Sequence, residues 1–305
     1  GTGYLAKIHF DVVGSAGSST TISFPADATL LLGDTSANPI PVGAWVDSGT
    51  VTVSSALSGA ITTKVGEVLQ KEGYVDETTF TFTGAGSGGT PDYTYQWDFE
   101  YDGSAFDIDA TGVEATHSYT TSDTYTVALK VIDSLPGDTE VIVTDEVTVY
   151  DTLTIDSCMV DPTEGAATCT EFTFSGTASG GKPSLTYAWN FGDGGAGAGT
   201  SPTHIYLAAP DCPGYPTYTV TFTVTDGLGT EKATNCIVDV YLLGDANGDY
   251  CTPETGGINV LDMTYVKNII LEKPGFTATP GADANCDGDV NIFDITTIKN
   301  MILPS

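Results

Sequence analysis

The chain has 305 residues, enough for two to four domains of ordinary size. Nine lysines and arginines stand against forty acidic residues, and the net charge of −31 disfavours nucleic acid and anionic membranes as partners but attracts divalent cations. Charged residues are only 16% of the chain, while Gly, Thr, Ser and Val are abundant, so the composition indicates β-sandwiches rather than a disordered acidic tail. No apolar run approaches the ~18 residues of a membrane span. The first residues read as a strand, so we expect that any leader was removed or never included.

The first segment, residues 1–57, contains three or four expected strands. Alternating apolar residues place them at 4–13, 20–24, 40–42 and 49–53. Their order resembles the C-terminal half of a cohesin domain, without its first half. Half a sandwich exposes strand edges and half a core, so three interpretations stay open. The chain is a fragment or processed form, the strands pack onto the next unit, or a neighbouring chain completes the sheet.

Two segments in the middle of the chain align with each other, which indicates an internal repeat. Each has Phe-x-Phe-x-Gly, then Tyr-x-Trp-x-Phe, then His-x-Tyr, then a long alternating strand that ends in Asp. The first copy has these motifs at 80–84, 95–99, 117–119 and 125–133, and the second at 172–176, 187–191, 204–206 and 218–226. The period of two, with Gly, Pro and Asp turns, predicts antiparallel Ig-like β-sandwiches. We expect them at 58–150 and 151–242.

The second unit continues its aromatic motif as Tyr187-Ala-Trp-Asn-Phe-Gly-Asp-Gly194. This stretch resembles the hallmark of PKD domains, and the first unit departs from it after Phe99. PKD domains are usually extracellular spacers or binding modules. We interpret the aromatic residues as core rather than as a ligand platform. We interpret His117 and His204, which recur at equivalent points, as packed or hydrogen-bonded residues rather than catalysts.

Five acidic residues crowd one turn of the first unit. Carboxylates at this density either share a cation or form a solvated acidic loop, and both interpretations stay open. The residues are Asp98, Glu100, Asp102, Asp107 and Asp109.

Four of the six cysteines belong to the second unit. None forms the CxxC pairs of a zinc site, so we expect disulfides and an oxidising compartment. In a sandwich, the loop that follows the first strand lies at the same end as the loop before the penultimate strand. This places Cys169 near Cys212 and leaves Cys158 beside Cys236. We favour these pairs among the three connectivities that four cysteines allow.

Residues 243–305 differ in character, because an acidic loop followed by a helix occurs twice. The second loop has the oxygen-ligand spacing of an EF-hand-type loop, with Gly288 at the sharp turn. The first has every ligand type but carries an insertion at 250–255. Hard oxygen ligands in a flexible loop favour calcium over magnesium, and metal-free Asp/Asn turns are the alternative. The expected ligands are Asp245, Asn247, Asp249, Gly257, Asn259 and Asp262 in the first loop, and Asp283, Asn285, Asp287, Asp289, Asn291 and Asp294 in the second.

After each loop, apolar residues three and four apart predict a helix with one apolar stripe. The stripes are Met263, Val266, Ile269 and Ile270 in the first helix, and Ile295, Ile298, Met301 and Ile302 in the second. The two can pack together. About 60 residues is small for independent stability, so calcium is expected to contribute folding free energy. Cys251 and Cys286 lie in adjacent loops, and we expect a disulfide between them.

The duplicated calcium loop with Asp at its last position, followed by a helix, resembles a dockerin. The resemblance implies calcium-dependent docking to a cohesin-like domain of another protein or of a neighbouring copy. In that family, loop positions ten and eleven and the following helix face make the contact. These positions are apolar here, unlike the Ser/Thr pairs common in cellulosome dockerins, which indicates a different specificity. Some of the four apolar residues could instead belong to the module's own core. The implied contact residues are Val260, Leu261, Ile292, Phe293, Lys267 and Lys299.

The favoured function is that of a non-catalytic extracellular assembly protein, mainly β, with a small helical calcium module at 243–305. A cohesin-like front and a dockerin-like tail would allow head-to-tail contacts and an open filament or surface array. The alternatives are the accessory region of a secreted polysaccharide-degrading enzyme and a glycan-binding adhesin. We expect no catalysis, because the sequence has no nucleophile elbow, HExxH or P-loop motif.

Overall fold

The computed structural model describes residues 56–134, 139–212, 215–250 and 257–303, together with the backbone of four short strands before them. Strand β1 (Ser19–Ile22) pairs antiparallel with β4 (Gly49–Thr52), and β2 (Leu32–Gly33) pairs with β3 (Pro39–Ile40). The rest of the expected cohesin-like segment lies outside the described residues. The chain divides into two compact units, residues 1–149 and 150–305.

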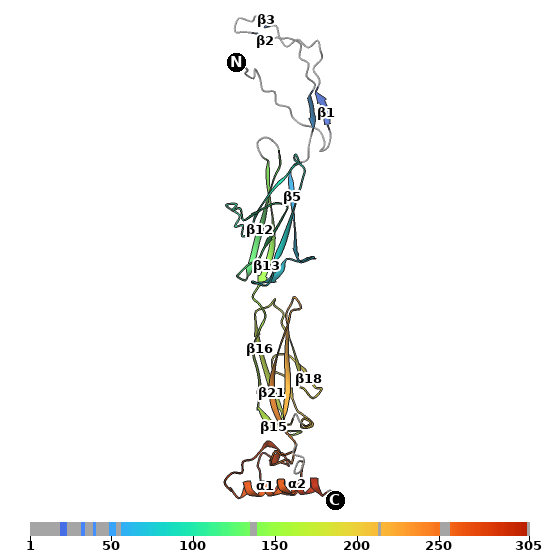
Figure 1. Cartoon of the computed structure of the whole chain (residues 1–305), viewed down its shortest axis with the longest axis vertical. Coiled ribbons are helices and arrows are strands. Elements are labelled where there is room, and N and C mark those ends of the chain that lie inside the picture. The colour runs from blue at the N-terminus through green and yellow to red at the C-terminus, as the bar shows by residue number, and fades with distance from the viewer. Residues whose placement is uncertain are drawn as a thin grey trace. The chain divides into compact units, whose positions relative to one another are not determined.

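The first unit contains a sandwich of two sheets (Figure 1). The five-stranded sheet has the order β10-β9-β12-β13-β7, and the four-stranded sheet has the order β11-β8-β5-β6. The strands are β5 (Ser58–Val65), β6 (Val68–Leu69), β7 (Glu72–Tyr74), β8 (Phe80–Ser87), β9 (Thr94–Asp98), β10 (Ala110–Thr111), β11 (Glu114–His117), β12 (Asp123–Ile132) and β13 (Glu140–Tyr150).

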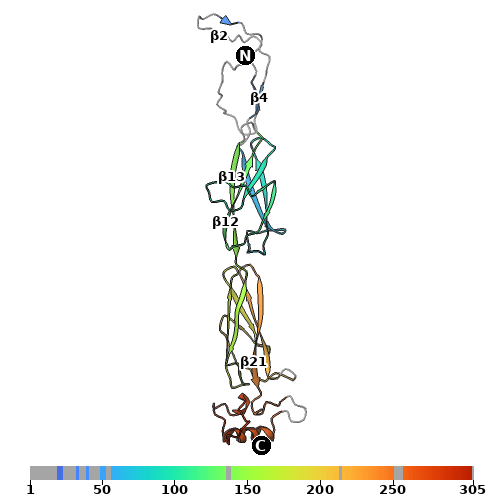
Figure 2. The same ribbon diagram turned by 60° about the vertical axis from the view of Figure 1, so that its left-hand side comes forward.

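The second unit contains a sandwich of the same kind, and Figure 2 shows its strand β21 from a second direction. Its sheets have the orders β14-β16-β19 and β15-β21-β20-β17-β18, with β15 parallel to β21. The strands are β14 (Thr154–Asp161), β15 (Glu164–Ala166), β16 (Phe172–Ser179), β17 (Thr186–Asn190), β18 (Ala196–Ala198), β19 (Thr203–His204), β20 (Thr217–Thr225) and β21 (Glu231–Tyr241). The expected sandwiches are therefore confirmed, and their equivalent strands follow the sequence repeat.

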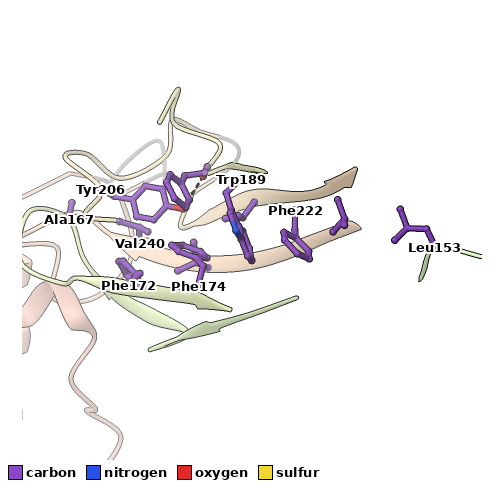
Figure 3. Close-up of a cluster of buried hydrophobic side chains, with 12 residues drawn as sticks. Leu153, Ala167, Phe172, Phe174, Trp189, Tyr206, Phe222 and Val240 are labelled. Atoms are coloured by element: carbon purple, nitrogen blue, oxygen red, sulfur yellow. Dashed lines mark hydrogen bonds between the residues drawn. The ribbon is translucent and has the colours of Figure 1, made fainter. Parts of the chain in front are cut away.

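The aromatic motif of each copy forms the core of its sandwich, as expected. Trp189 is 2% exposed and lies opposite Phe222 on the neighbouring strand, with the ring centroids 4.3 Å apart (Figure 3). Its indole N–H donates to the carbonyl of Gly199 at 2.8 Å, which satisfies the one polar atom of the ring. Trp97 is fully buried in the first sandwich. Neither indole is available as a platform for a glycan.

The two repeated histidines are packed against the aromatic cores, also as expected. His117 stacks on Phe99 with ring centroids 4.4 Å apart, and His204 stacks on Phe191 at 4.2 Å. The Nε2 atom of His204 lies 2.7 Å from a carboxylate oxygen of Asp193. Burial lowers the pKa of His117, which favours its neutral form. These contacts give both residues a structural role.

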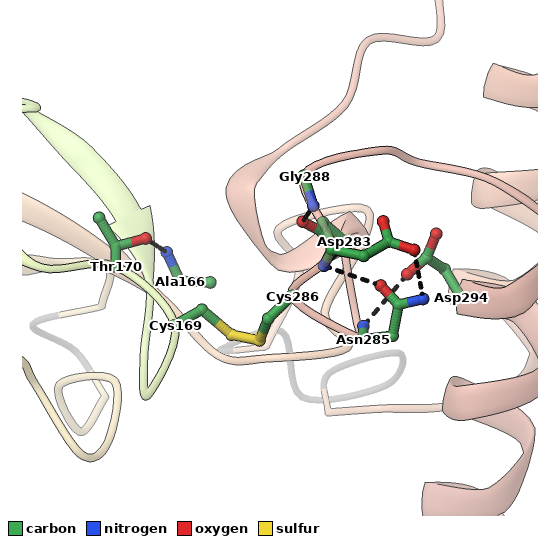
Figure 4. Close-up of a disulfide and its surroundings, with 9 residues drawn as sticks. Ala166, Cys169, Thr170, Asp283, Asn285, Cys286, Gly288 and Asp294 are labelled. Atoms are coloured by element: carbon green, nitrogen blue, oxygen red, sulfur yellow. Dashed lines mark hydrogen bonds between the residues drawn. A yellow bond between two sulfur atoms is a disulfide. The ribbon is translucent and has the colours of Figure 1, made fainter.

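The disulfides agree with one expected pair and contradict the other two. Cys158 bonds to Cys236 and so joins β14 to β21, two strands of opposite sheets. Cys169, in the turn after β15, bonds to Cys286 of the C-terminal module, with a Cα–Cα distance of 5.7 Å (Figure 4). The expected pairs Cys169–Cys212 and Cys251–Cys286 are therefore wrong, because this end of the sandwich adjoins the second acidic loop. Cys212 is disulfide-bonded as well, and Cys251 lies outside the described residues.

The described residues of the C-terminal module form two helices and a short 3-10 turn. Helix α1 (Val260–Ile270) packs on α2 (Ile292–Ile302), and η1 (Pro280–Ala282) lies between them in sequence. Val266 and Ile298 are fully buried at the centre of their small core. The apolar stripes are as expected except at Ile270 and Met301, which are 39% and 37% exposed at its margin. No helix in the described ranges is long and apolar enough to span a membrane.

Candidate calcium loops and docking surface

Both helices begin with the same capping arrangement, and it fixes the last expected ligand of each loop. The side chains of Asn259 and Asn291 accept hydrogen bonds from the helix backbone at the N-cap. In return, Asp262 accepts from the backbone N–H of Asn259 at 2.9 Å, and Asp294 from that of Asn291 at 2.7 Å. Each loop therefore ends in a carboxylate held by the first turn of its helix.

The first loop gathers three carboxylates. One oxygen from each of Asp245, Asp249 and Asp262 lies within 4.8 Å of the others, and this is the one such acidic group among the described residues. Asp245 and Asp262 are fully buried. The backbone N–H of Ala246 donates to Asp262 at 2.9 Å, so the end of the loop is tied to its beginning. The insertion therefore does not keep the expected ligands apart.

The electrostatics of the first loop favour a bound cation. The Oδ1 atom of Asp249 is buried and has no hydrogen-bond partner. Burial raises the pKa of Asp262 to about 6, and the charges of Asp245 and Asp249 add to this effect. Burial likewise raises the pKa of Asp245. A hard divalent cation offsets such repulsion and gives the unpaired oxygen a partner, so the residues present fit calcium.

The second loop has the same internal hydrogen bonds but is more open. The backbone N–H of Asp287 donates to both Asp283 (3.2 Å) and Asn285 (3.1 Å), as the N–H of Asp249 does to Asp245 and Asn247 in the first loop. Figure 4 shows Asp283, Asn285 and Asp294 around this turn. Asp294 is fully buried, whereas Asp287 is exposed. The two remaining expected ligands offer backbone carbonyls, which accept from the amide groups of the Asn two residues later; they are Gly257 (2.8 Å) and Asp289 (3.3 Å).

The four apolar residues at the helix starts lie on the surface. Their exposed fractions are 63% for Val260, 45% for Leu261, 60% for Ile292 and 66% for Phe293. None of them belongs to the core of the module, so the interpretation of these residues as core is wrong. Lys267 and Lys299 are also exposed, one on each helix. We call Val260, Leu261, Ile292 and Phe293 the apolar quartet.

The acidic turn of the first sandwich has a structural explanation. Asp98 is 4% exposed and accepts from the backbone N–H groups of Glu100 (3.1 Å) and Asp107 (2.9 Å). Asp102 accepts from the hydroxyl and the N–H of Ser104, and these bonds lower its pKa. Asp109 accepts from the N–H of Phe99 at 2.8 Å. These carboxylates hold the turn together, and no three of them gather as those of the first loop do.

Sequence reasoning missed one residue at the first loop. The hydroxyl of Tyr215, which lies in the second sandwich just before β20, donates to Oδ2 of Asp245. Nothing in the loop sequence points to a residue 30 positions earlier in the chain. Its neighbours Tyr241 and Tyr250, with ring centroids 6.0 and 5.3 Å from its own, are aromatic too, but only the fold brings the three together.

Comparison with known families agrees with the architecture. A PKD domain model matches residues 69–145, a second PKD domain model matches 158–239, and a dockerin type I domain model matches 243–303. No curated protein matches the chain.

Three solved structures illustrate the similarity of the chain to known proteins. The PKD1 domain of Vibrio anguillarum Epp is 23% identical over 30% of this chain and 98% of its own, with a TM-score of 0.25. The fibronectin(III)-like modules of Clostridium thermocellum CbhA are 10% identical over 59% of this chain and 94% of their own, with a TM-score of 0.32. Murine CEACAM1b is 10% identical over 60% of this chain and 100% of its own, with a TM-score of 0.37. All three TM-scores lie below 0.5 and carry no functional conclusion.

Proposed function

Because the chain contains two PKD domains followed by a type I dockerin domain, we propose that it is a non-catalytic extracellular assembly protein. Its C-terminal module docks onto a cohesin-like domain when calcium fills both acidic loops. The disulfides and the secreted character of such modules support an extracellular location.

One observation carries this proposal: in each loop, two exposed apolar residues stand directly between an N-cap Asn and a buried Asp. Val260 and Leu261 lie between Asn259 and Asp262. Ile292 and Phe293 occupy the same places in the second loop. Ion binding by the carboxylates and presentation of the apolar quartet therefore depend on the same short backbone segments. Exposed apolar groups of this kind are typical of a protein interface.

Calcium would be held by the twelve expected ligand residues, six in each loop. It supplies a positive charge to a site that already contains two fully buried carboxylates in the first loop. The chain itself orients the carboxylates. The capping boxes hold Asp262 and Asp294, and the loop N–H groups hold Asp245 and Asp283. Without the ion, repulsion among the carboxylates loosens the loops and the helix starts that follow them.

The partner is a cohesin-like domain, either of another protein or of a second copy of this chain. The second possibility depends on the cohesin-like segment of residues 1–57, most of which lies outside the described residues. The accessory region of a secreted polysaccharide-degrading enzyme is the alternative, and it uses the same docking surface. It differs by requiring a catalytic domain encoded upstream of Gly1, which sequencing of the gene decides.

The test measures binding of the full chain to two probes, a recombinant type I cohesin domain and the chain itself. Biolayer interferometry is done in millimolar calcium and in EGTA. We expect binding to at least one probe in calcium and none in EGTA. The double variant Leu261→Asp/Phe293→Asp should weaken binding by about 30-fold or more, as loss of central interface residues does. Calcium-independent binding, or no binding to either probe, contradicts the proposal.

A matched control is an equally exposed apolar residue away from the quartet. Leu207, on the second sandwich, is 81% exposed. Leu207→Asp introduces the same charge and should leave binding unchanged. Circular dichroism of all variants in calcium separates a lost contact from a lost fold.

A further inference from the structure

Each acidic loop is held by one residue of the second sandwich. The hydroxyl of Tyr215 donates a hydrogen bond to Asp245 of the first loop, and Cys169 forms a disulfide with Cys286 of the second. Neither residue belongs to the C-terminal module. The sandwich and the module nevertheless form one compact unit, residues 150–305. Two different kinds of bond thus tie two different loops to the same sandwich.

The packing of the Tyr215 ring directs its hydroxyl group toward Asp245. Its ring packs against Tyr241 at the end of β21 and against Tyr250 of the first loop. The Tyr215 hydroxyl is the donor of this hydrogen bond, because the carboxylate oxygen of Asp245 accepts. Asp245 is fully buried, and its carboxylate takes its other hydrogen bonds from the backbone N–H groups of Asp249 and Tyr250 in the loop itself. The hydroxyl is therefore the contact from outside the loop that orients this carboxylate.

Cys286 occupies a backbone position that a side chain rarely adopts. Its φ of 59° is left-handed, and Gly248 at the equivalent place of the first loop has a φ of 71°. Glycine is the favoured residue in this conformation. A cysteine there is explained by its bond to the sandwich, which the glycine of the first loop lacks.

The sandwich end of the disulfide is firmly held. The Thr170 hydroxyl accepts from the backbone N–H of Ala166 at 3.0 Å, as Figure 4 shows, and the N–H of Thr168 donates to the carbonyl of Tyr206 at 2.7 Å. Cys169 lies inside this turn. The 3-10 turn η1, just before the second loop, also lies next to β15 and β21. The second loop is thus fixed to a rigid part of the sandwich.

We propose that the second sandwich is a component of both calcium sites. Tyr215 is a positioning residue for Asp245, and the Cys169–Cys286 disulfide restrains the second loop in its binding conformation. Calcium then stabilises the sandwich as well as the module, because a coupling that raises ion affinity works equally in the other direction. The inference rests on the proposal above that calcium occupies the loops.

The first test replaces Tyr215 by phenylalanine in the full chain, which keeps the ring and removes the donor. The backbone amides of Asp249 and Asp287 report the two loops separately in ¹⁵N NMR spectra during a calcium titration. We expect about a tenfold loss of affinity in the first loop, as for other residues that orient metal ligands, and no change in the second. Tyr187→Phe is the matched control, since its ring stacks on Phe222 inside the sandwich. Equal calcium affinities for Tyr215→Phe and the control overturn the positioning role of Tyr215. If Tyr215 has a purely structural role, Tyr215→Phe lowers the stability of the chain but not its calcium affinity.

The second test removes the Cys169–Cys286 disulfide with the double variant Cys169→Ser/Cys286→Ser. We expect the second loop to lose about fivefold or more in calcium affinity, a common size for coupling between sites, while the first loop keeps its affinity. The control, Cys158→Ser/Cys236→Ser, removes the disulfide inside the sandwich and should spare both loops. If this variant keeps its calcium affinity at the second loop, the proposed role of the Cys169–Cys286 disulfide is overturned.

A third measurement needs no variant and so does not depend on their folding. Hydrogen–deuterium exchange of the wild-type chain is compared in calcium and in EGTA. We expect calcium to slow exchange in β15, β20 and β21, with β12 and β13 of the first sandwich as the internal control. Slowing confined to residues 243–303 overturns the inference but leaves the docking proposal intact. If calorimetry detects no calcium uptake by the full chain, both the inference and the docking proposal are overturned.

Discussion

The two acidic loops have nearly the same expected ligands but different surroundings. The first is interrupted by an insertion in sequence, yet its carboxylates Asp245 and Asp262 are fully buried and gather with Asp249 within 4.8 Å. The second has regular spacing, yet Asp287 and Asp289 are exposed and its carboxylates stay further apart. Sequence spacing therefore identifies the expected ligands of each loop, but it does not show the contact of Asp245 with Tyr215 of the neighbouring sandwich.

The largest expected effect comes from removing the last carboxylate of either loop. Asp262→Ala and Asp294→Ala should each lower calcium affinity at their own loop by about 100-fold or more, because ligand charge strongly controls affinity in such loops. Each also removes one half of a capping box. Isothermal titration calorimetry should then find one remaining site per variant. If Asp294→Ala leaves two sites, the second loop does not bind calcium as we describe.

The next effect compares the two halves of the apolar quartet. Phe293→Ala should weaken docking by about 2 kcal/mol, and Leu261→Ala by about half as much, since Phe293 is the larger residue and the more exposed. Biolayer interferometry in calcium measures both, with the probe that binds the wild-type chain. Equal losses would indicate that the partner covers both helix starts alike. A larger loss for Leu261→Ala would place the centre of the interface on the first helix.

In the absence of calcium, a lower pH should increase the stability of the chain through the buried carboxylate of Asp262 in the first loop. The pKa of Asp262 is raised to about 6 from its ordinary 3.8, so between these values the folded chain binds more protons than the unfolded chain. In EGTA the stability of residues 150–305 should therefore rise as the pH falls from about 7 to about 5, by about 1 kcal/mol. Chemical denaturation at both pH values measures this gain. Asp262→Asn should reduce this gain, leaving the smaller part that comes from Asp245. Stability that falls as the pH is lowered, in both proteins, would contradict the prediction.

The smallest effect is expected at Asp289. Its backbone contributes to the second loop through the carbonyl and through the N–H, which donates to Asp287 at 3.0 Å, whereas its side chain is exposed. Asp289→Ala should change calcium affinity by no more than about threefold, the share of a distant exposed charge. Asp287→Ala, two residues earlier, removes an expected side-chain ligand and should lower calcium affinity at this loop by about tenfold or more, which is less than the loss expected for Asp294→Ala. Calorimetry on the pair separates main-chain from side-chain coordination.

Much of this architecture could be predicted from the sequence because it depends on short-range patterns of residues. The Tyr-x-Trp-x-Phe repeat predicts both sandwich cores, and the apolar spacing after each acidic loop predicts both helices. Apolar spacing alone left open whether Leu261 and Phe293 were core or surface. The structure decides this point, since residues at the first turn of each helix lie beyond the small core.

The contacts between the sandwich and the module could not be predicted. The sequence predicts a Cys169–Cys212 pair, because both residues belong to loops at one end of a sandwich, and a Cys251–Cys286 pair, because these residues lie in adjacent loops. Both expectations treated the units as independent. The actual partner of Cys169 is 117 residues away, and that of Asp245 is Tyr215. Long-range pairs of this sort leave no periodicity in the sequence.

The disulfide between Cys169 and Cys286 bears on how this chain can be dissected for engineering. A dockerin cut out at residue 243 for use as a fusion tag would carry an unpaired thiol at Cys286 and a buried carboxylate at Asp245 without its tyrosine. Such a tag would invite oxidative crosslinking during purification. A portable cassette that begins at residue 150 avoids this, and it keeps the compact unit whole.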